Sequence, residues 1–179
     1  MKQRGAVEAI GLLLRDRRLR ERFAAERKIV LEELKVVPEE WNCLLHLSLE
    51  QLGNQAESLI GKRQGAVAKL LPVTWRRLGC RAQQQYRDYV DSADWPPTHQ
   101  RHLLDAEWFC CFLAEHRVEA YSRDEHHWVS FLLSRRRFSI QLLRTPDRQS
   151  HQRFVVQCCF RGRRLPFKKT ISLFRFKSR

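Results

Sequence analysis

Two histidines and an aspartate recur at a spacing of three in the middle of the chain: His99, His102 and Asp105. On a helix these side chains lie within about 120° of arc, and imidazole and carboxylate groups are common metal ligands. The same helix face continues into apolar positions at Ala106 and Leu113, so we interpret the set as a structural cluster that fixes the helix start by hydrogen bonding. Metal-dependent catalysis by these three residues is the alternative, and it predicts bound metal in the purified single chain.

The six cysteines lack the spacing of a metal or redox site. They are Cys43, Cys80 and the adjacent pairs Cys110-Cys111 and Cys158-Cys159. There is no C-x-x-C pair and no C…H spacing typical of a zinc site. Adjacent cysteines point to different faces, so neither pair easily forms an internal disulfide. We expect reduced thiols and no metal in this chain.

Sequence signatures of common enzymes are missing. The chain has no G-x-G-x-x-G, no P-loop, no G-x-S-x-G and no H-E-x-x-H. A catalytic triad scattered along the sequence would escape such a search. We therefore expect that the chain is not an enzyme and that it carries no cofactor of its own.

Positive charge is concentrated in the last third of the chain. The 179 residues have a formal net charge of +14. Residues 117–179 hold 16 of the 34 Lys and Arg residues and four of the 20 acidic residues, a net of +12, which leaves +2 for residues 1–116. Such a field favours an anionic partner, which is nucleic acid, an acidic peptide or an acidic protein face.

The pattern of apolar residues indicates helices throughout residues 1–116. Three short helices are expected before residue 35, with Asp16 as the cap of the second. Ser48 and Gln51 form a capping box, which predicts a longer helix that Pro72 ends. These helices form the N-terminal part of the expected fold.

From about Trp128 the apolar period changes to two, which is typical of half-buried strands. The pattern predicts four strands, at His127–Leu133, Phe138–Leu143, Phe154–Phe160 and Phe167–Phe176. Their short connections suit an antiparallel meander. The expected fold class is α+β, with an N-terminal multi-helix domain, residues 1–116, followed by a basic antiparallel-sheet domain of three to four strands, residues 117–179.

Arginines flank two of the expected turns. In an up-and-down meander the first and third turns lie at the same end of the sheet, so six arginines should meet there. They are Arg135, Arg136, Arg137, Arg161, Arg163 and Arg164. We interpret this basic pole as a docking surface for an anionic partner, and the alternative is that exposed turns are simply often rich in arginine.

Three stretches of the helical part together resemble a known protein family. They are Leu12–Phe23 (LLLRDRRLRERF), Gln55–Arg63 (QAESLIGKR) continuing at Leu70–Gly79 (LLPVTWRRLG), and Trp95–Ala106 (WPPTHQRHLLDA). They resemble the small accessory proteins that partner multinuclear non-haem iron-dependent oxidative enzymes in bacterial peptide-modification pathways, and most closely the accessory subunits of 3-thiaglutamate biosynthesis. The resemblance covers residues 10–115; beyond residue 117 only the general plan of a basic, strand-rich end is shared.

The resemblance implies a heterodimer of two proteins with separate tasks. The iron enzyme would hold the iron ions and remove the β-carbon of a cysteine at the end of a carrier peptide. The present chain would bind the leader of that peptide, with its helical domain contacting the enzyme and its sheet domain contacting the peptide.

A peptide can add to an open sheet edge as an extra strand, while arginines near the rim pair with its carboxylates. The expected edge is Phe154–Phe160 or Phe167–Phe174. The expected peptide-binding residues are Arg135, Arg136, Arg137, Phe154, Val155, Val156, Gln157, Cys158, Cys159, Phe160, Arg161, Arg163 and Arg164.

Two further expectations concern partners and location. A basic region with interleaved Phe and Arg is also the footprint of a nucleic-acid-binding protein, which is the competing hypothesis. No stretch longer than nine residues lacks a charged residue, so we expect no membrane span, and the N-terminus has too short an apolar core for an export signal. We therefore expect a cytoplasmic protein.

Overall fold

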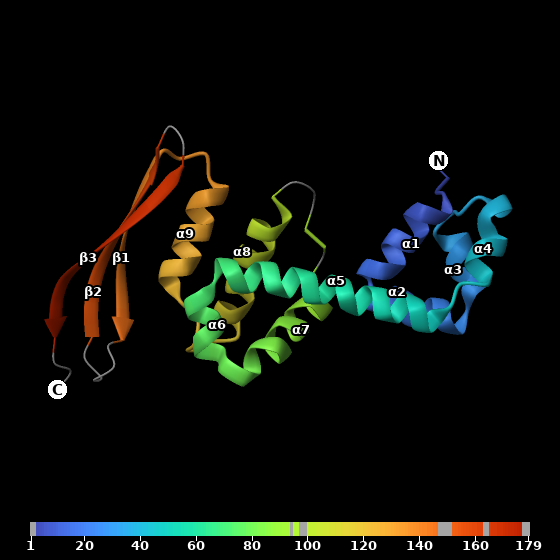
Figure 1. Cartoon of the computed structure of the whole chain (residues 1–179), viewed down its shortest axis with the longest axis horizontal. Coiled ribbons are helices and arrows are strands. Elements are labelled where there is room, and N and C mark those ends of the chain that lie inside the picture. The colour runs from blue at the N-terminus through green and yellow to red at the C-terminus, as the bar shows by residue number, and fades with distance from the viewer. Residues whose placement is uncertain (1–2, 94, 97–99, 147–151, 163–164, 177–179) are drawn as a thin grey trace. The chain divides into compact units, whose positions relative to one another are not determined.

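A computed structural model describes residues 3–93, 95–96, 100–146, 152–162 and 165–176. Helices occupy the N-terminal part of the chain, and a three-stranded antiparallel sheet follows them (Figure 1). The predicted α+β fold class is therefore confirmed.

The helices and strands follow one another in a simple order. The helices are α1 (Ala6–Arg15), α2 (Arg17–Ala25), α3 (Arg27–Glu33), α4 (Trp41–Leu45), α5 (Leu49–Leu70), α6 (Pro72–Leu78), α7 (Ala82–Ser92), α8 (Arg101–Glu115) and α9 (Arg123–Leu133), with short 3₁₀ turns at Pro38–Glu40 and Gly79–Arg81. The strands are β1 (Phe138–Pro146), β2 (Gln152–Arg161) and β3 (Pro166–Phe176).

The chain forms two compact units. The first contains Met1–Gln64 and Val90–Trp95, and the second contains Gly65–Tyr89 and Pro96–Arg179. The division therefore falls within α5 and within α7. The expected domain boundary after residue 116 lies inside the second unit, between α8 and α9.

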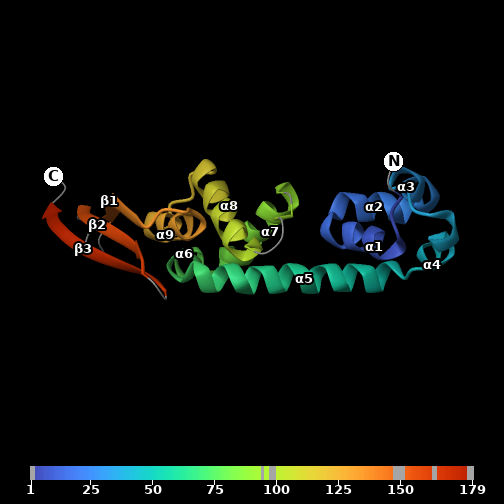
Figure 2. The same ribbon diagram turned by 90° about the horizontal axis from the view of Figure 1, so that it is seen from above.

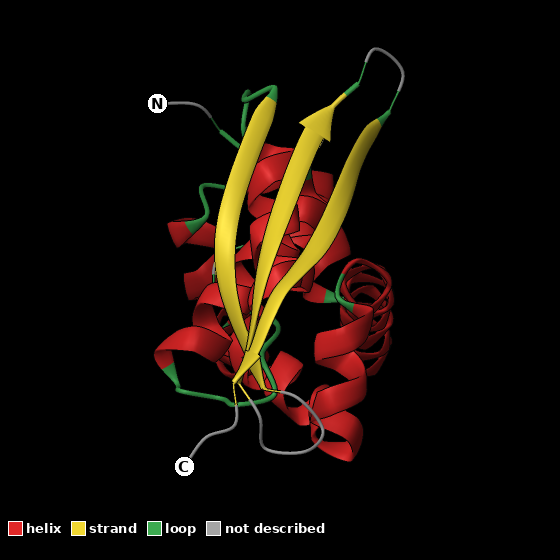
Figure 3. Ribbon diagram, turned by 90° about the vertical axis from the view of Figure 1, so that its left-hand side faces the viewer, coloured by secondary structure: helices red, strands yellow, loops and turns green. Residues whose placement is uncertain are grey.

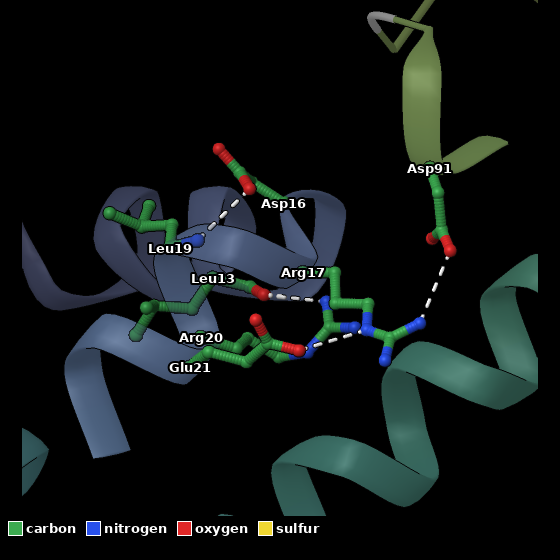
Figure 4. Close-up of polar contacts among 7 residues, drawn as sticks. All are labelled: Leu13, Asp16, Arg17, Leu19, Arg20, Glu21 and Asp91. Atoms are coloured by element: carbon green, nitrogen blue, oxygen red, sulfur yellow. Dashed lines mark hydrogen bonds and ion pairs between the residues drawn. The ribbon is translucent and has the colours of Figure 1, made fainter. Parts of the chain in front are cut away.

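The first unit contains short helices around one apolar core. Asp16 separates α1 from α2, and its carboxylate accepts the N–H of Leu19 at 3.0 Å, which is the predicted cap (Figure 4). The guanidinium of Arg20 donates to the carbonyls of Leu13 and Leu14 at the end of α1, at 2.9 and 3.1 Å. The buried core consists of Ala9, Leu13, Phe23, Val30, Leu31, Val36, Leu44 and Leu52.

In the second unit, a buried carboxylate ties α7 to α8. Asp105 on α8 accepts hydrogen bonds from the hydroxyls of Tyr86 and Tyr89, at 2.8 and 2.7 Å. The two tyrosine rings also contact Phe109, with centroid distances of 5.3 and 5.5 Å. A buried carboxylate is tolerated here because both of its oxygens accept hydrogen bonds.

The segment His127–Leu133, expected to be a strand, belongs to helix α9, and this expectation is wrong. A short apolar run does not distinguish a strand from a buried helix, and here tertiary contacts decide. The carboxylate of Glu125 accepts the N–H groups of Val73 and Thr74 at the start of α6, at 2.6 and 2.8 Å. These are donors that a helix start leaves without a partner of its own, so α9 caps α6.

The sheet has the strand order β1-β2-β3 and packs one face against α9, as the two views in Figures 1 and 2 show. The side chains that face the helix include the buried Leu143, Val155 and Cys159. Between them lies the fully buried Gln157, whose amide oxygen hydrogen-bonds His127 of α9. Helix α9 is thus the layer on which the sheet rests.

We expect Glu125→Ala to lower the free energy of unfolding by about 2–4 kcal/mol, because one buried and one partly buried N–H donor lose a charged acceptor. Glu125→Gln keeps one acceptor oxygen and should fall between this variant and the wild type. Glu115→Ala, at an exposed position, is the matched control. Urea denaturation followed by circular dichroism measures the difference, and equal midpoints for the Glu125→Ala and Glu115→Ala variants would contradict the capping role.

Candidate functional site

The face of the sheet turned away from α9 is apolar and exposed. Figure 3 looks onto this face, which no described element of the second unit covers. Its side chains are those of Phe138, Ile140, Leu142, Val156, Cys158, Phe160, Phe167, Lys169 and Ile171, as the strand register places them in three rows. Ile140 and Leu142 are 57% and 60% exposed, whereas Leu143 on the opposite face is 2% exposed. An apolar surface of this kind is typical of an interaction site.

An aromatic row crosses all three strands at one end of this face. Phe138, Phe160 and Phe167 are direct neighbours in the register. The ring centroids of Phe138 and Phe160 lie 4.8 Å apart, and those of Phe160 and Phe167 lie 5.1 Å apart. Such contacts pre-order the rings, so a ligand that packs on them loses little further side-chain freedom.

The two outer strands, β1 and β3, have edges without a strand partner in the described chain. The N–H of Arg161 donates to the carbonyl of Arg137 at 2.8 Å, so these two residues form a hydrogen-bonded pair at the end of the β1–β2 ladder. Hydrogen-bonded and non-hydrogen-bonded pairs alternate along antiparallel strands, so the next pair, Phe138 with Phe160, is not hydrogen-bonded. The main-chain groups of Phe138, Ile140 and Leu142 therefore point away from β2, toward the free edge of β1. This edge presents N–H and C=O groups to any added strand.

Four of the six arginines expected at one end of the sheet lie there, although the segment before Arg135 is helix α9 and not the first strand of the expected meander. Arg135, Arg136 and Arg137 precede β1 and are exposed, and they form no ion pair with another described side chain. Arg161, at the end of β2, lies beside them through its main-chain bond to Arg137. Arg163 and Arg164 lie outside the described residues.

The side chain of Arg161 already has partners within the chain. Its guanidinium donates to the carbonyls of Phe131, Leu132 and Ser134 at 3.3, 3.1 and 2.8 Å. These carbonyls belong to the end of α9, where a helix leaves acceptors unpaired and carries partial negative charge. Arg161 therefore caps α9, and its expected role as a peptide contact stays a prediction.

Of the two expected peptide edges, Phe154–Phe160 is wrong, whereas Phe167–Phe174 belongs to the outer strand β3. The segment Phe154–Phe160 lies in β2, which pairs with β1 on one side and with β3 on the other, so its backbone offers no free edge. Val155, Gln157 and Cys159 are buried against α9, and their side chains cannot contact a peptide. Of the expected set, Phe154, Val156, Cys158 and Phe160 remain less buried.

The cluster expected at the start of α8 is only partly assembled. Asp105 accepts the two tyrosine hydroxyls described above, and His102 is exposed. His99 lies outside the described residues. The structure thus brings Asp105 together with α7, and it does not place His102 in the same buried site.

A different polar cluster joins α8 to α9. Glu107 and Cys111 lie four residues apart on α8, and with His126 of α9 their ligand atoms all lie within 4.8 Å of one another. His126 Nε2 lies 3.0 Å from Glu107 Oε1 and 3.9 Å from Cys111 Sγ. Ser130 donates to both carboxylate oxygens of Glu107 at 2.7 and 2.8 Å, and the hydroxyl of Tyr121 hydrogen-bonds His126 Nδ1.

Sequence reasoning missed this cluster, although part of its signal is there. The i,i+4 spacing of Glu107 and Cys111 on a predicted helix places both side chains on one face. The apolar pattern places His126 beside an expected strand, where adjacent histidines point to opposite sides. In the structure both histidines belong to helix α9. His126 hydrogen-bonds Glu107 of α8, and His127 hydrogen-bonds Gln157 of the sheet.

The cluster is not arranged as a nucleophilic triad. Glu107 and Cys111 both approach Nε2 of His126, whereas in a triad the acid orients the imidazole through its other nitrogen. Burial raises the pKa of the Cys111 thiol, and the nearby charge of Glu107 raises it further. A thiol with a raised pKa supplies little of the reactive thiolate at neutral pH.

Comparison with other proteins adds no relative to this picture. No family model, curated protein or solved structure matches the chain. Among the described helices, none joins the length and the apolar composition that a bilayer span requires. The resemblance of residues 10–115 to accessory proteins of iron oxidases stays a prediction from the sequence.

We expect Arg161→Ala to destabilise the protein by about 1–2 kcal/mol. The carbonyls at the end of α9 lose their hydrogen bonds from the guanidinium, and they also lose a favourable positive charge. Arg161→Lys keeps the charge without the planar fork and should be affected less. Arg136→Ala is the control, because its side chain is exposed at the same end of the sheet. Thermal unfolding of the three variants measures the effect, and an unchanged midpoint for Arg161→Ala would rule out the cap.

Exposed cysteines should react before the clustered one. In EDTA at about pH 7, iodoacetamide should label Cys43 and Cys80 first, because both are exposed, and Cys111 later, because its pKa is raised. Raising the pH increases the thiolate fraction, so labelling of Cys111 should accelerate. Peptide mapping by mass spectrometry follows each site, and labelling of Cys111 as fast as Cys80 at neutral pH would contradict a raised pKa for the Cys111 thiol.

Proposed function

We propose that this chain is a non-catalytic accessory protein that binds a carrier peptide in the cytoplasm. It presents the C-terminal cysteine of that peptide to a partner multinuclear non-haem iron oxidase, which removes the β-carbon in 3-thiaglutamate biosynthesis. The iron ions belong to the partner, and the two proteins form a heterodimer. The observation that supports peptide binding is the free edge of β1, uncharged from Phe138 to Leu143, beside an apolar sheet face.

The edge of β1 suits strand addition better than that of β3. From Phe138 to Leu143 the strand contains no charged residue, and its outward main-chain groups are unpaired within the described sheet. Strand β3 starts at Pro166 and carries Lys168 and Lys169, which are typical devices for protecting an edge. A peptide on β1 gains main-chain hydrogen bonds, and its alternate side chains join the apolar face.

Charge sets the direction and the chemistry of the bound peptide. Arg135, Arg136 and Arg137 stand at the start of β1 and are exposed. Carboxylates at one end of an added strand would pair with these guanidinium groups, while apolar residues in the strand would lie beside Ile140 and Leu142. The expected ligand is therefore an extended segment with alternating apolar side chains and an acidic end.

A specific feature also supports a second function, binding of single-stranded nucleic acid. Phe138, Phe160 and Phe167 form an aromatic row on an open sheet next to arginines, and bases stack on such rows. The neighbouring rows contain Ile140, Leu142 and Val156 with Lys169 as the one charged residue, which favours a partly apolar peptide over a polyanion.

Proline substitutions can test the edge directly. Ile140→Pro removes a main-chain N–H that points outward on β1, so β1–β2 pairing is retained and strand addition is interrupted. By the same alternation, Thr170→Pro removes an outward N–H on β3 and is the matched control. We expect Ile140→Pro to weaken binding of the carrier peptide about tenfold or more, as loss of one or two main-chain bonds implies, and Thr170→Pro to leave it unchanged.

The measurement uses the full chain co-expressed with an iron oxidase and the carrier peptide encoded beside it, followed by fluorescence anisotropy with the labelled peptide. Absence of both co-purification and peptide binding would overturn the proposed function. The salt dependence of binding distinguishes peptide binding from nucleic-acid binding. Affinity for nucleic acid through six or more phosphates falls about 10³-fold or more between about 50 and 200 mM salt. Strand addition should change far less.

A further inference from the structure

The polar cluster between α8 and α9 has the composition of a metal site. Its three members offer a carboxylate, a thiol and an imidazole, which are the three ligand types that zinc takes from proteins. We infer that Glu107, Cys111 and His126 bind a zinc ion that joins α8 to α9. This inference goes beyond the proposed function and does not depend on it.

Two of the three distances between the ligand atoms lie close to those around a tetrahedral ion. Zinc bonds of about 2.0–2.3 Å at tetrahedral angles place pairs of ligand atoms about 3.3–3.6 Å apart. The observed separations are 3.0 Å between Glu107 Oε1 and His126 Nε2, and 3.9 Å between His126 Nε2 and Cys111 Sγ. The third pair, a carboxylate oxygen of Glu107 and Cys111 Sγ, lies within 4.8 Å, so adjustment of these flexible side chains would bring the three atoms to bonding positions.

The ligands are already oriented by neighbouring groups. A metal-bound histidine usually donates its second ring N–H to an oxygen acceptor, which aims the first nitrogen at the ion. Here Tyr121 provides that oxygen at Nδ1 of His126, and Ser130 holds the carboxylate of Glu107 through two hydrogen bonds. These contacts hold Nε2 of His126 and the Glu107 carboxylate near Cys111 Sγ, and the three ligand atoms lie within 4.8 Å of one another.

Charge and access are also suitable for a divalent cation. A carboxylate and a thiolate with a neutral imidazole give the ligand set a charge of minus two, which balances the ion. The side chains of His126 and Glu107 are 23% and 21% exposed, so an ion can enter from solvent and water can take the fourth position. A bound ion would therefore link the helix that supports the sheet to the helix that carries Asp105.

The test is metal analysis of the full chain purified without a metal-binding tag. Loading with zinc and dialysis should leave one equivalent of zinc per chain, and Co²⁺ in its place should give the absorption of a tetrahedral thiolate complex. Cys111→Ser and His126→Asn should lose the zinc and the thiolate absorption. Cys80→Ser makes the same chemical change at an exposed thiol and should keep both.

Two readouts keep the result interpretable where a ligand variant folds poorly. Tyr121→Phe leaves all three ligands in place and should weaken zinc affinity about 10–100-fold. EDTA should lower the midpoint of thermal unfolding of the wild type, and added zinc should restore it. Absence of zinc and of the cobalt absorption in the wild type would overturn the site, as would one full equivalent of zinc in both the Cys111→Ser and His126→Asn variants.

Discussion

Buried polar groups need partners, and helix α9 meets this constraint on several sides at once. Glu125 caps the start of α6, His126 reaches the Glu107 carboxylate on α8, and His127 hydrogen-bonds Gln157 beneath the sheet. Arg161, at the end of β2, donates hydrogen bonds to the carbonyls at the end of the same helix. Because each contact uses a different face or end of α9, the second unit is organised around this one helix.

The position of α9 also explains why the sheet exposes its more apolar side. One face of the sheet must accommodate His127 and therefore contains its polar partners, the buried Gln157 and the partly buried Ser139. The strict alternation of the strands then sends Ile140 and Leu142 outward. The apolar face and the free edge of β1 thus follow from how the helix is anchored.

The sequence predicted the elements that depend on local signals. The cap at Asp16, the helix that starts after Ser48 and the three strands from Phe138 onward all lie where pattern and caps placed them. The nature of α9 was missed, because its short apolar run suits either element and its helical state depends on distant partners such as Val73. The side of the sheet that is buried is likewise a tertiary property that alternation alone does not determine.

The exposed apolar face of the sheet also affects how the isolated protein associates with itself in solution. Ile140 and Leu142 are accessible to a second copy, while a net charge of +14 keeps copies apart. The Debye length shrinks as ionic strength rises, so this repulsion fades while apolar attraction persists. Storage in dilute buffer therefore favours dispersed molecules, and concentrated salt favours self-association through the sheet.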